Sequence, residues 1–462
     1  MTLSLPKENV ISRSDGRSQV RRTQPNLLFI FSDEHRACSL SGEPYCDVQT
    51  THLRRLAQEG TVFENCISNY PVCSPYRAML LSGRWPFQTG VVDNALRLPD
   101  EEFSLGEAFR CAGYQTGYIG KWHLSPADHG AAEFIPKGPA RQGFEDWQVW
   151  SNTRQHFGAF TFDPDTGQII RREGYSATLM TDAAIDYIGT RAAKPWLLVL
   201  SWGPPHAPFE TAPPETMRMY DPEFLQLRPN VPAEIAPLMR GFLRGYYGHI
   251  SALDSELGRL LDKLDETGQA ANTIVVYTSD HGTMMGSHGY GYKRLPFDEA
   301  CKVPFLLRYP GVVPANRTTD VLLGAIDLFP SLCGLAAVPV PAHCEGMDLS
   351  EAMRGSAMRV PESAFLMHIQ RTKAGGESGR RAPLFRGVRT ERFTYAIADT
   401  GRWCLYDNKE DPYQMRNLID DPACAPTASE LNGLVFDWLA RAHDPFPLDA
   451  ARRQRSPLIV LT

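Results

Sequence analysis

The sequence predicts an α/β fold in which helices cover both faces of a mostly parallel sheet. Short, continuous apolar runs recur along the 462 residues, as expected of strands that are buried on both faces. Each run ends at polar or charged residues, and helical patterns lie between the runs. Strands that alternate with helices in this way are typical of parallel sheets.

The strand and helix patterns also indicate where a site would form. The predicted strands span residues 26–31, 114–119, 196–200 and 273–277. The predicted helices span residues 52–58, 176–189 and 238–264. In such sheets, ligands bind beyond the carboxyl ends of the strands. We therefore expect one site to gather the polar residues that follow these strands, namely Asp33, Lys121, His123, His206, Asp280 and His281.

The last hundred residues have a different pattern of predicted secondary structure. Three runs predict antiparallel strands, at residues 385–390, 392–397 and 403–407. A predicted helix follows at residues 428–442. We divide the chain into a polar leader (1–24), a main domain (25–360) and a small α+β C-terminal subdomain with an antiparallel sheet and a tail (361–462). The apolar tail at residues 456–462 predicts a docking surface and thus a homo-oligomer.

Composition narrows the class of protein. With 43% hydrophobic and 22% charged residues, the chain can bury a large core. Its 47 Lys and Arg against 53 Asp and Glu argue against a general nucleic-acid binder. No apolar stretch is long enough for a transmembrane helix, so no membrane partner is expected. The first 24 residues lack the apolar core of a secretory signal, which predicts a cytoplasmic protein.

One segment is especially informative. It reads Cys73-Ser74-Pro75-Tyr76-Arg77 and ends in Leu81-Ser82-Gly83-Arg84. It resembles the signature of type I sulfatases, Cys-x-Pro-Ser-Arg followed by Leu-Thr/Ser-Gly-Arg, with Tyr76 where the family usually has Ser. The resemblance implies an alkaline-phosphatase-like sandwich fold and hydrolysis of sulfate monoesters. It also implies that a formylglycine-generating enzyme oxidises Cys73 to formylglycine, whose hydrate is the nucleophile.

A second segment strengthens the resemblance. Residues 113–124, Gly-Tyr-Gln-Thr-Gly-Tyr-Ile-Gly-Lys-Trp-His-Leu, match the second sulfatase signature almost letter for letter. The family's equivalents of Lys121 and His123 hold the formylglycine hydrate, and Arg77 supports the same group electrostatically. The segments around His206 and Lys293 resemble family segments that bind sulfate oxygens and donate a proton to the leaving alcohol.

Further polar residues complete the predicted site. Asn94 is a predicted hydrogen-bond donor to the substrate. A carboxylate and an imidazole on adjacent loop residues suit a divalent cation, as in Asp280-His281. The resemblance implies that the metal ligands are Asp33, Asp280, His281, the modified Cys73 and, as a further candidate, Glu34. Asp-Asn sites in this family favour Ca²⁺, whereas the imidazole at position 281 shifts the prediction toward Mn²⁺ or Zn²⁺.

Two other functions remain open at this stage. A phosphonate monoester or phosphodiester hydrolase of the same superfamily shares the cysteine, the first-strand Asp and the Asp-His pair. It carries Tyr and Thr where sulfatases carry the equivalents of Lys121 and His123. A non-catalytic anion-binding relative, with Cys73 left as a thiol, is the other alternative and is motivated by Tyr76.

The variable loops would set specificity. They span residues 125–143, 150–174 and 211–236. Their aromatic and histidine side chains either line an aryl or sugar pocket or pack as a lid; these are Trp150, His156, Phe157, Phe160 and Phe162.

Overall fold

The structure is a computed structural model that describes residues 24–126, 134–150, 156–191, 193–370 and 382–446. The apolar tail and all but the last residue of the predicted leader lie outside these ranges.

The large sheet contains the predicted strands in its centre. Its strand order is β11-β2-β10-β8-β1-β7-β3-β4-β5-β6, and β9 pairs with β2. The five strands from β8 to β4 are parallel, and the strands beyond them add antiparallel pairs. The bounds are β1 Asn26–Asp33, β2 Thr61–Ile67, β3 Gln115–Lys121, β4 Asp146–Trp150, β5 Phe160–Phe162, β6 Ile169–Arg171, β7 Trp196–Pro205, β8 Thr273–Ser279, β9 Lys302–Val303, β10 Leu306–Arg308 and β11 Arg317–Gly324.

Strand β1 shows why the central runs are continuously apolar. All eight of its residues are buried, between β7 on one side and β8 on the other. Leu27, Phe29 and Phe31 point into one core and Leu28 and Ile30 into a second core on the opposite face. A strand that is covered on both faces has no polar side to alternate with.

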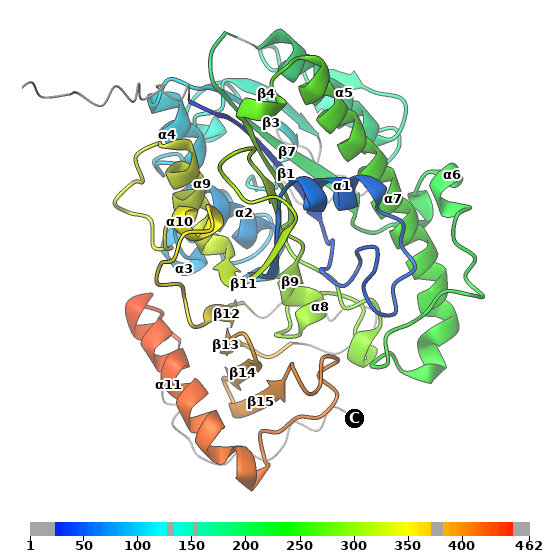
Figure 1. The fold of residues 1–462 in the computed structure, drawn as a ribbon, viewed down its shortest axis with the longest axis vertical. Helices are drawn as coiled ribbons and strands as arrows, with labels where there is room; N and C mark the ends of the chain where they lie inside the picture. Colours follow the sequence, from blue (N-terminus) through cyan, green and yellow to red (C-terminus); the bar gives the residue numbers. More distant parts are fainter. Residues whose placement is uncertain (1–23, 127–133, 151–155, 192, 371–381, 447–462) are drawn as a thin grey trace, which may run out of the picture.

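Helices cover both faces of this sheet, as Figure 1 shows. On one side lie α1 (Thr51–Glu59), α5 (Ser176–Thr190) and α7 (Ala236–Glu266), which contact one another and strands of the sheet. On the other lie α2 (Cys73–Ser82), α4 (Leu105–Cys111) and α9 (Leu328–Ala336). The short helices are α3 (Pro86–Thr89), α6 (Pro214–Met217), α8 (Asp298–Cys301) and α10 (Ser350–Met353). The prediction of a mostly parallel, helix-covered sheet is confirmed.

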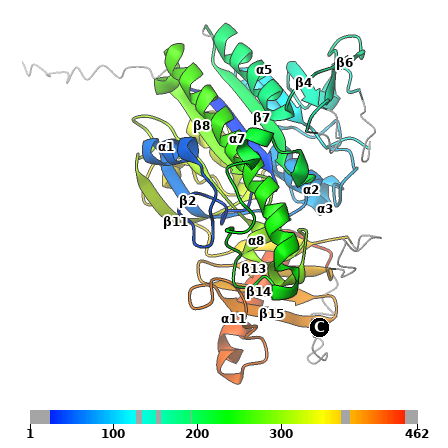
Figure 2. The ribbon, with the colours of Figure 1, turned by 90° about the vertical axis from the view of Figure 1, so that its right-hand side faces the viewer.

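A second sheet follows in the chain and lies below the large sheet in both views (Figures 1 and 2). It is antiparallel, in the order β12-β13-β14-β15, and α11 packs on it. Three of its strands and the helix were predicted, whereas β12 was missed. The bounds are β12 Ala364–His368, β13 Phe385–Arg389, β14 Phe393–Ala398, β15 Gly401–Asp407 and α11 Ala425–Arg441. The predicted domain boundary at residues 360 and 361 stays a prediction.

The described part of the chain contains no helix that combines the length and the apolar composition needed to cross a membrane.

Candidate active site

The carboxyl ends of neighbouring strands bring the acidic residues together. Asp33 ends β1, Asp280 directly follows β8, and the two strands pair in register up to Ser32 and Ser279. Asp33 and Asp280 are fully buried. Asp33 and Asp280 therefore lie next to each other at this edge of the sheet, as expected of residues that follow neighbouring parallel strands, and the roles predicted for them stay predictions.

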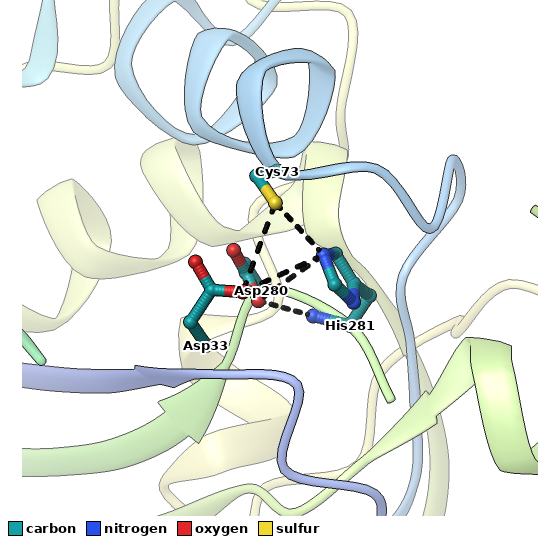
Figure 3. A group of neighbouring side chains, drawn as sticks. All are labelled: Asp33, Cys73, Asp280 and His281. Atoms are coloured by element: carbon teal, nitrogen blue, oxygen red, sulfur yellow. Dashed lines mark hydrogen bonds and ion pairs between the residues drawn. The ribbon is translucent and has the colours of Figure 1, made fainter. Parts of the chain in front are cut away.

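Cys73 lies over this acidic pair because it begins helix α2 (Figure 3). Its Sγ is 3.3 Å from His281 Nε2, 3.3 Å from Lys293 Nζ and 3.7 Å from Asp33 Oδ1. Every residue of α2 is buried, so the helix holds the cysteine in a fixed place. The positive end of the helix also favours negative charge at residue 73.

The charge environment of Cys73 differs from that of an ordinary core cysteine. Burial and the Asp33 carboxylate act to raise the pKa of its thiol, but the surrounding positive charges outweigh both and hold the pKa well below its usual value; these charges are Lys121, Lys293 and His281. In contrast, burial raises the pKa of the core thiols of Cys66 and Cys301. The site therefore stabilises an anion at residue 73.

Arg77 lies one helical turn after Cys73 and is 1% exposed. Its Nη2 is 3.2 Å from Asp33 Oδ2 and 3.2 Å from Asp280 Oδ2. Its Nη1 donates to the Lys121 carbonyl at 2.7 Å and to Ser201 Oγ at 2.6 Å. Arg77 thus orients the two carboxylates, and it acts on residue 73 through charge rather than through a hydrogen bond. Sequence reasoning missed Ser201, which carries no motif of its own.

The second signature segment enters the site from the end of β3. Lys121 Nζ is hydrogen-bonded to Asp33 Oδ2. His123 is 5% exposed, and neither of its ring nitrogens forms a hydrogen bond with any residue that the structure describes. Burial and the Lys121 charge lower the pKa of His123 to about 4. A neutral buried imidazole beside Cys73 is suited to receive or hold a polar group of a ligand at residue 73.

Steric constraints explain why a glycine precedes Lys121. Gly120 has φ of +114°, and a Cβ at this position would lie 2.0 Å from the carbonyl oxygen of Ser201 on β7. Only glycine permits both the dihedral angle and this close approach.

Glu34 forms a second cluster beside the first. Its Oε1 is 2.5 Å from Lys293 Nζ and 3.4 Å from His206 Nε2. Its backbone has φ of +73°, which is uncommon for a residue with a side chain. The Tyr246 hydroxyl donates to the Glu34 carbonyl at 2.7 Å and accepts from the Arg36 N–H at 3.0 Å. Tyr246 lies in the middle of α7, and sequence reasoning missed it.

Asn94 and His288 have contacts that separate their roles. Asn94 Oδ1 accepts from the Ser74 N–H at 3.1 Å, which holds the Asn94 side chain beside the start of α2; its role as a hydrogen-bond donor to the substrate stays a prediction. His288 stacks on Phe297 with ring centroids 4.2 Å apart, and its Nε2 lies 3.2 Å from Asn230 Nδ2. Both contacts are with residues outside the group around Cys73, which indicates a structural role for His288.

Four side chains form a donor set that fits a divalent cation. Ligand atoms of Asp33, Cys73, Asp280 and His281 lie within 4.8 Å of one another (Figure 3). His281 Nδ1 lies 2.8 Å from the Gly282 carbonyl, so Nδ1 carries a proton and Nε2 faces the other three; a cation would take the place of the Nε2 proton that the positively charged ring carries without it. Burial and the Asp33 charge raise the pKa of Asp280 to about 7, because two buried carboxylates resist ionising together. A bound cation would remove this conflict.

Glu34 stands apart from this donor set. Its carboxylate groups with Asp33 and His206 instead, again within 4.8 Å. Its role as a metal ligand stays a prediction.

The family model for sulfatases matches residues 25–338, about two thirds of the chain. The chain belongs to the sulfatase family. It is thus a type I sulfatase of the alkaline-phosphatase-like superfamily and a sulfuric ester hydrolase. A second model, N-sulphoglucosamine sulphohydrolase, C-terminal, matches residues 286–438 of this sulfatase.

Known proteins resemble this sulfatase over most of its length. The ulvan-active sulfatase of Formosa agariphila is 36% identical, over 92% of this chain and 83% of the relative. The N-acetylglucosamine-6-O-sulfatase of Bacteroides thetaiotaomicron is 27% identical, over 96% and 92% of the two chains. The solved structure of YidJ from Bacteroides fragilis superposes with a TM-score of 0.83 at 28% identity, covering 93% of this chain and 98% of its own.

A rival activity also has a structural neighbour. The phosphonate monoester hydrolase of Agrobacterium radiobacter superposes with a TM-score of 0.74 at 23% identity, over 90% of this chain and 96% of its own. A likeness at this level of identity shows the shared fold alone.

The loop residues considered for a substrate pocket divide into two groups. Trp150 is 4% exposed and packs in the core with the helices, and His156 is 4% exposed and bonded to the His206 carbonyl. Phe157 is 42% exposed, and Phe160 and Phe162 are half-buried. Parts of these loops, residues 127–133 and 151–155, lie outside the described residues.

Proposed function

We propose that this sulfatase hydrolyses sulfate monoesters of sugars, with Cys73 as the precursor of a formylglycine nucleophile. The observation that carries the proposal is the position of Cys73 Sγ, 3.3 Å from both His281 Nε2 and Lys293 Nζ at the head of a buried helix. A cysteine that only fills the core has no need of three positive side chains around it. A nucleophile that attacks an anionic ester does need them.

The residues around Cys73 would divide the work of binding and proton transfer. Lys121 and His123 would hold the hydrate at residue 73, and Asn94 would bind a sulfate oxygen. A hydrated aldehyde at residue 73 supplies one hydroxyl for attack on sulfur and a second whose deprotonation expels sulfate, so no water needs to attack the covalent intermediate.

The metal site would be made by Asp33, Asp280, His281 and the modified residue 73, with Glu34 as a further candidate. When bound, a divalent cation such as Ca²⁺, Mn²⁺ or Zn²⁺ polarises a sulfate oxygen and lowers the pKa of the attacking hydroxyl. Arg77 would keep the two Asp carboxylates aimed at it, through hydrogen bonds of 3.2 Å.

The leaving alcohol would meet His206 and Lys293. As the S–O bond breaks, its electron pair stays on the alcohol oxygen, which takes a proton from the Lys293 ammonium or from Nε2 of His206 in its protonated, imidazolium form. Both approach Glu34 Oε1, at 3.4 and 2.5 Å. Glu34 would therefore keep the two donors next to each other.

The names of similar proteins support a sugar as the alcohol. The relatives at 36% and 27% identity are described as an ulvan-active sulfatase and an N-acetylglucosamine-6-O-sulfatase. Choline-sulfatase and arylsulfatase relatives have lower identities, 25% and 26%. A panel of sugar, aryl and choline sulfates tests this part of the proposal, and we expect the highest kcat/KM for a sugar sulfate.

Mass spectrometry of the peptide that contains residue 73 tests the nucleophile. Protein produced together with a formylglycine-generating enzyme should carry the aldehyde at residue 73 and release sulfate. An unmodified thiol together with no sulfate release would favour a non-catalytic anion binder instead, and Tyr76 is the residue that motivates this control.

The phosphonate monoester or phosphodiester hydrolase is the second candidate, favoured by the Asp280-His281 pair. Lys121 and His123 argue for sulfate, since that branch has Tyr and Thr in their place. Comparing kcat/KM for nitrophenyl sulfate and a phosphonate monoester decides between the two. A clear preference for the phosphonate would overturn the assignment.

A further inference from the structure

The segment that carries His206 is held by two other histidines. We call residues 204–208 the His206 segment; it leads from the end of β7 towards α7. His156 Nε2 is 2.7 Å from the His206 carbonyl oxygen, and His249 Nε2 is 3.3 Å from the Pro208 carbonyl oxygen. The backbone is therefore bonded at the catalytic candidate itself and again two residues later.

These two histidines form a packed unit with a tyrosine. Their rings are 4.6 Å apart, and Tyr175 stacks on His249 at 5.9 Å with an interplanar angle of 18°. The Tyr175 hydroxyl lies 2.8 Å from His249 Nδ1. His156, Tyr175 and His249 are 4%, 7% and 0% exposed, so bulk water does not compete for these bonds.

The direction of each hydrogen bond follows from the partners. A carbonyl oxygen only accepts, so each Nε2 carries a proton and donates it. Burial lowers the pKa of His156 to about 4 and that of His249 well below its usual value, so both rings are neutral near pH 7. Nδ1 of a neutral His249 then accepts from the Tyr175 hydroxyl. One arrangement of protons satisfies all three contacts.

His156, Tyr175 and His249 come from three separate parts of the chain and meet beside the His206 segment. His156 lies just before β5, Tyr175 precedes the first residue of α5, and His249 lies in the middle of α7. The Ser176 N–H donates to the His156 carbonyl at 2.7 Å, which links the first two parts. Helices α5 and α7 pack on each other, so the His206 segment is attached to a rigid pair of helices.

We propose that His156, His249 and Tyr175 are positioning residues that hold His206 in place to protonate the leaving alcohol. This inference rests on the proposed function of His206. His206 Nδ1 lies 2.7 Å from the Ala207 carbonyl, so the ring orientation depends on the backbone that the two histidines hold. The Ala207 carbonyl accepts from Nδ1, so Nε2 faces Glu34 and the centre of the site and carries a transferable proton in the imidazolium form; burial lowers the pKa of His206, and the Glu34 carboxylate acts in the opposite direction.

The dependence of the rate on the leaving group tests this role. A poor leaving group needs a proton as the S–O bond breaks, whereas a good one leaves as an anion. We therefore measure kcat/KM of the complete, modified enzyme for a series of substituted phenyl sulfates. His206→Ala should lose activity most strongly on esters of the least acidic phenols, giving a steeper dependence on the phenol pKa.

Two variants each remove one hydrogen-bonding group and keep an aromatic ring at that position. His156→Phe removes the donor to the His206 carbonyl, and Tyr175→Phe removes the hydroxyl that bonds His249. Each should lose about 10- to 100-fold on the poorest leaving group and about 2-fold or less on 4-nitrophenyl sulfate. His156→Gln, which retains an N–H donor, should recover part of the loss. The matched control is Tyr187→Phe, which changes a buried tyrosine of α5. It should leave the dependence of kcat/KM on the phenol pKa unchanged.

A double variant separates positioning from general support of the fold. In a His206→Ala background, His156→Phe should cause no further loss, because the group that it positions is gone. Equal losses on all esters, full additivity in the double variant, or an unchanged slope would overturn the inference. If the wild-type enzyme releases no sulfate from any ester, the proposed function itself fails, and this result is distinct from an unchanged slope in an active enzyme.

Discussion

Charged residues are paired differently at the active site and at the contact between α8 and the second sheet, which we call the sheet contact. At the contact, Arg389 at the end of β13 meets Asp298 at the start of α8 through two parallel bonds of 2.9 and 3.0 Å. At the site, a single nitrogen of Arg77 is shared between Asp33 and Asp280, at 3.2 Å from each. The first arrangement gives each partner two bonds, whereas the second shares one guanidinium nitrogen between two buried carboxylates, of which Asp33 also accepts from Lys121.

The two kinds of pairing suit different roles, structural support at the sheet contact and ligand binding at the active site. A fork-to-fork Arg–carboxylate pair satisfies both charged groups, and removing one partner leaves the other as a charge without compensation. The site instead keeps a histidine without partners and an Asp with a raised pKa, namely His123 and Asp280. Such groups are costly to bury without a counter-charge or a hydrogen-bond partner, and a cation and an anionic ester would satisfy them.

The largest effect should come from Cys73→Ala, which removes the proposed nucleophile and leaves the sheet contact intact. Sulfate release should fall by about 10⁵-fold or more, as when the nucleophile of a hydrolase is deleted. Cys404→Ala in β15 is the matched control, because that cysteine is also buried but lies far from the acidic pair in the chain. The control should keep its kcat and lose about 1 kcal/mol of unfolding free energy. Wild-type rates in Cys73→Ala would contradict the assignment.

Metal removal should have the next largest effect. A chelator should lower kcat by about 10²- to 10³-fold and lower the midpoint of thermal unfolding, because Asp33 and Asp280 lose the cation that relieves their repulsion. Metal analysis and add-back of Mn²⁺, Ca²⁺ and Zn²⁺ identify the ion. Asp280→Asn should retain less metal, and Asp298→Asn should retain as much as the wild type. Unchanged activity and unfolding midpoint after complete metal removal would refute the metal site.

Breaking the Arg389–Asp298 pair should lower the stability and leave the activity nearly unchanged, which is the opposite of the result expected for Cys73→Ala. Asp298→Asn leaves the Arg389 guanidinium buried without a carboxylate and should cost about 2–4 kcal/mol of unfolding free energy in urea. The value of kcat/KM per folded molecule should stay within about 2-fold, since the pair binds no substrate. A double-mutant cycle with Arg389→Gln isolates the pair. A variant that unfolds like the wild type, or one that is stable and inactive, would show that the two regions are not separate in function.

The smallest effect should be a pH dependence of that loss. Burial alone would raise the pKa of Asp298, but the charge and hydrogen bonds of Arg389 hold it below its usual value. A depressed pKa in the folded state stabilises the protein above the unfolded value of about 4 and ceases to do so as the pH falls through the folded pKa. The stability difference between wild type and Asp298→Asn should therefore be constant from pH 7 to 5 and shrink below about pH 4. Urea unfolding at each pH measures it, and a difference that grows in acid would contradict the pairing.

Most of the strands that flank the central strands of the large sheet were not predicted from the sequence. The central strands are buried on both faces and were predicted from their apolar runs, as for β1 and β8. Strand β2, Thr61–Ile67, includes the exposed Glu64 and was missed, as was the five-residue β12. His156 carried no signal for packing, because a polar residue in an aromatic loop fits a pocket equally well. Only its contact with the His206 carbonyl revealed what it supports.

The sequence by itself determined the fold class and nearly every charged residue that enters the site. Apolar periodicity marks buried strands, and two short segments around Cys73 and Lys121 are specific enough to indicate a sulfatase. Tertiary structure alone decided how these charges are shared: Glu34 faces Lys293 and His206 instead of joining Asp280, and Ser201 and Tyr246 support the site from β7 and α7. The reason is physical, because ion pairs and hydrogen bonds depend on distances of about 3 Å between residues far apart in the chain.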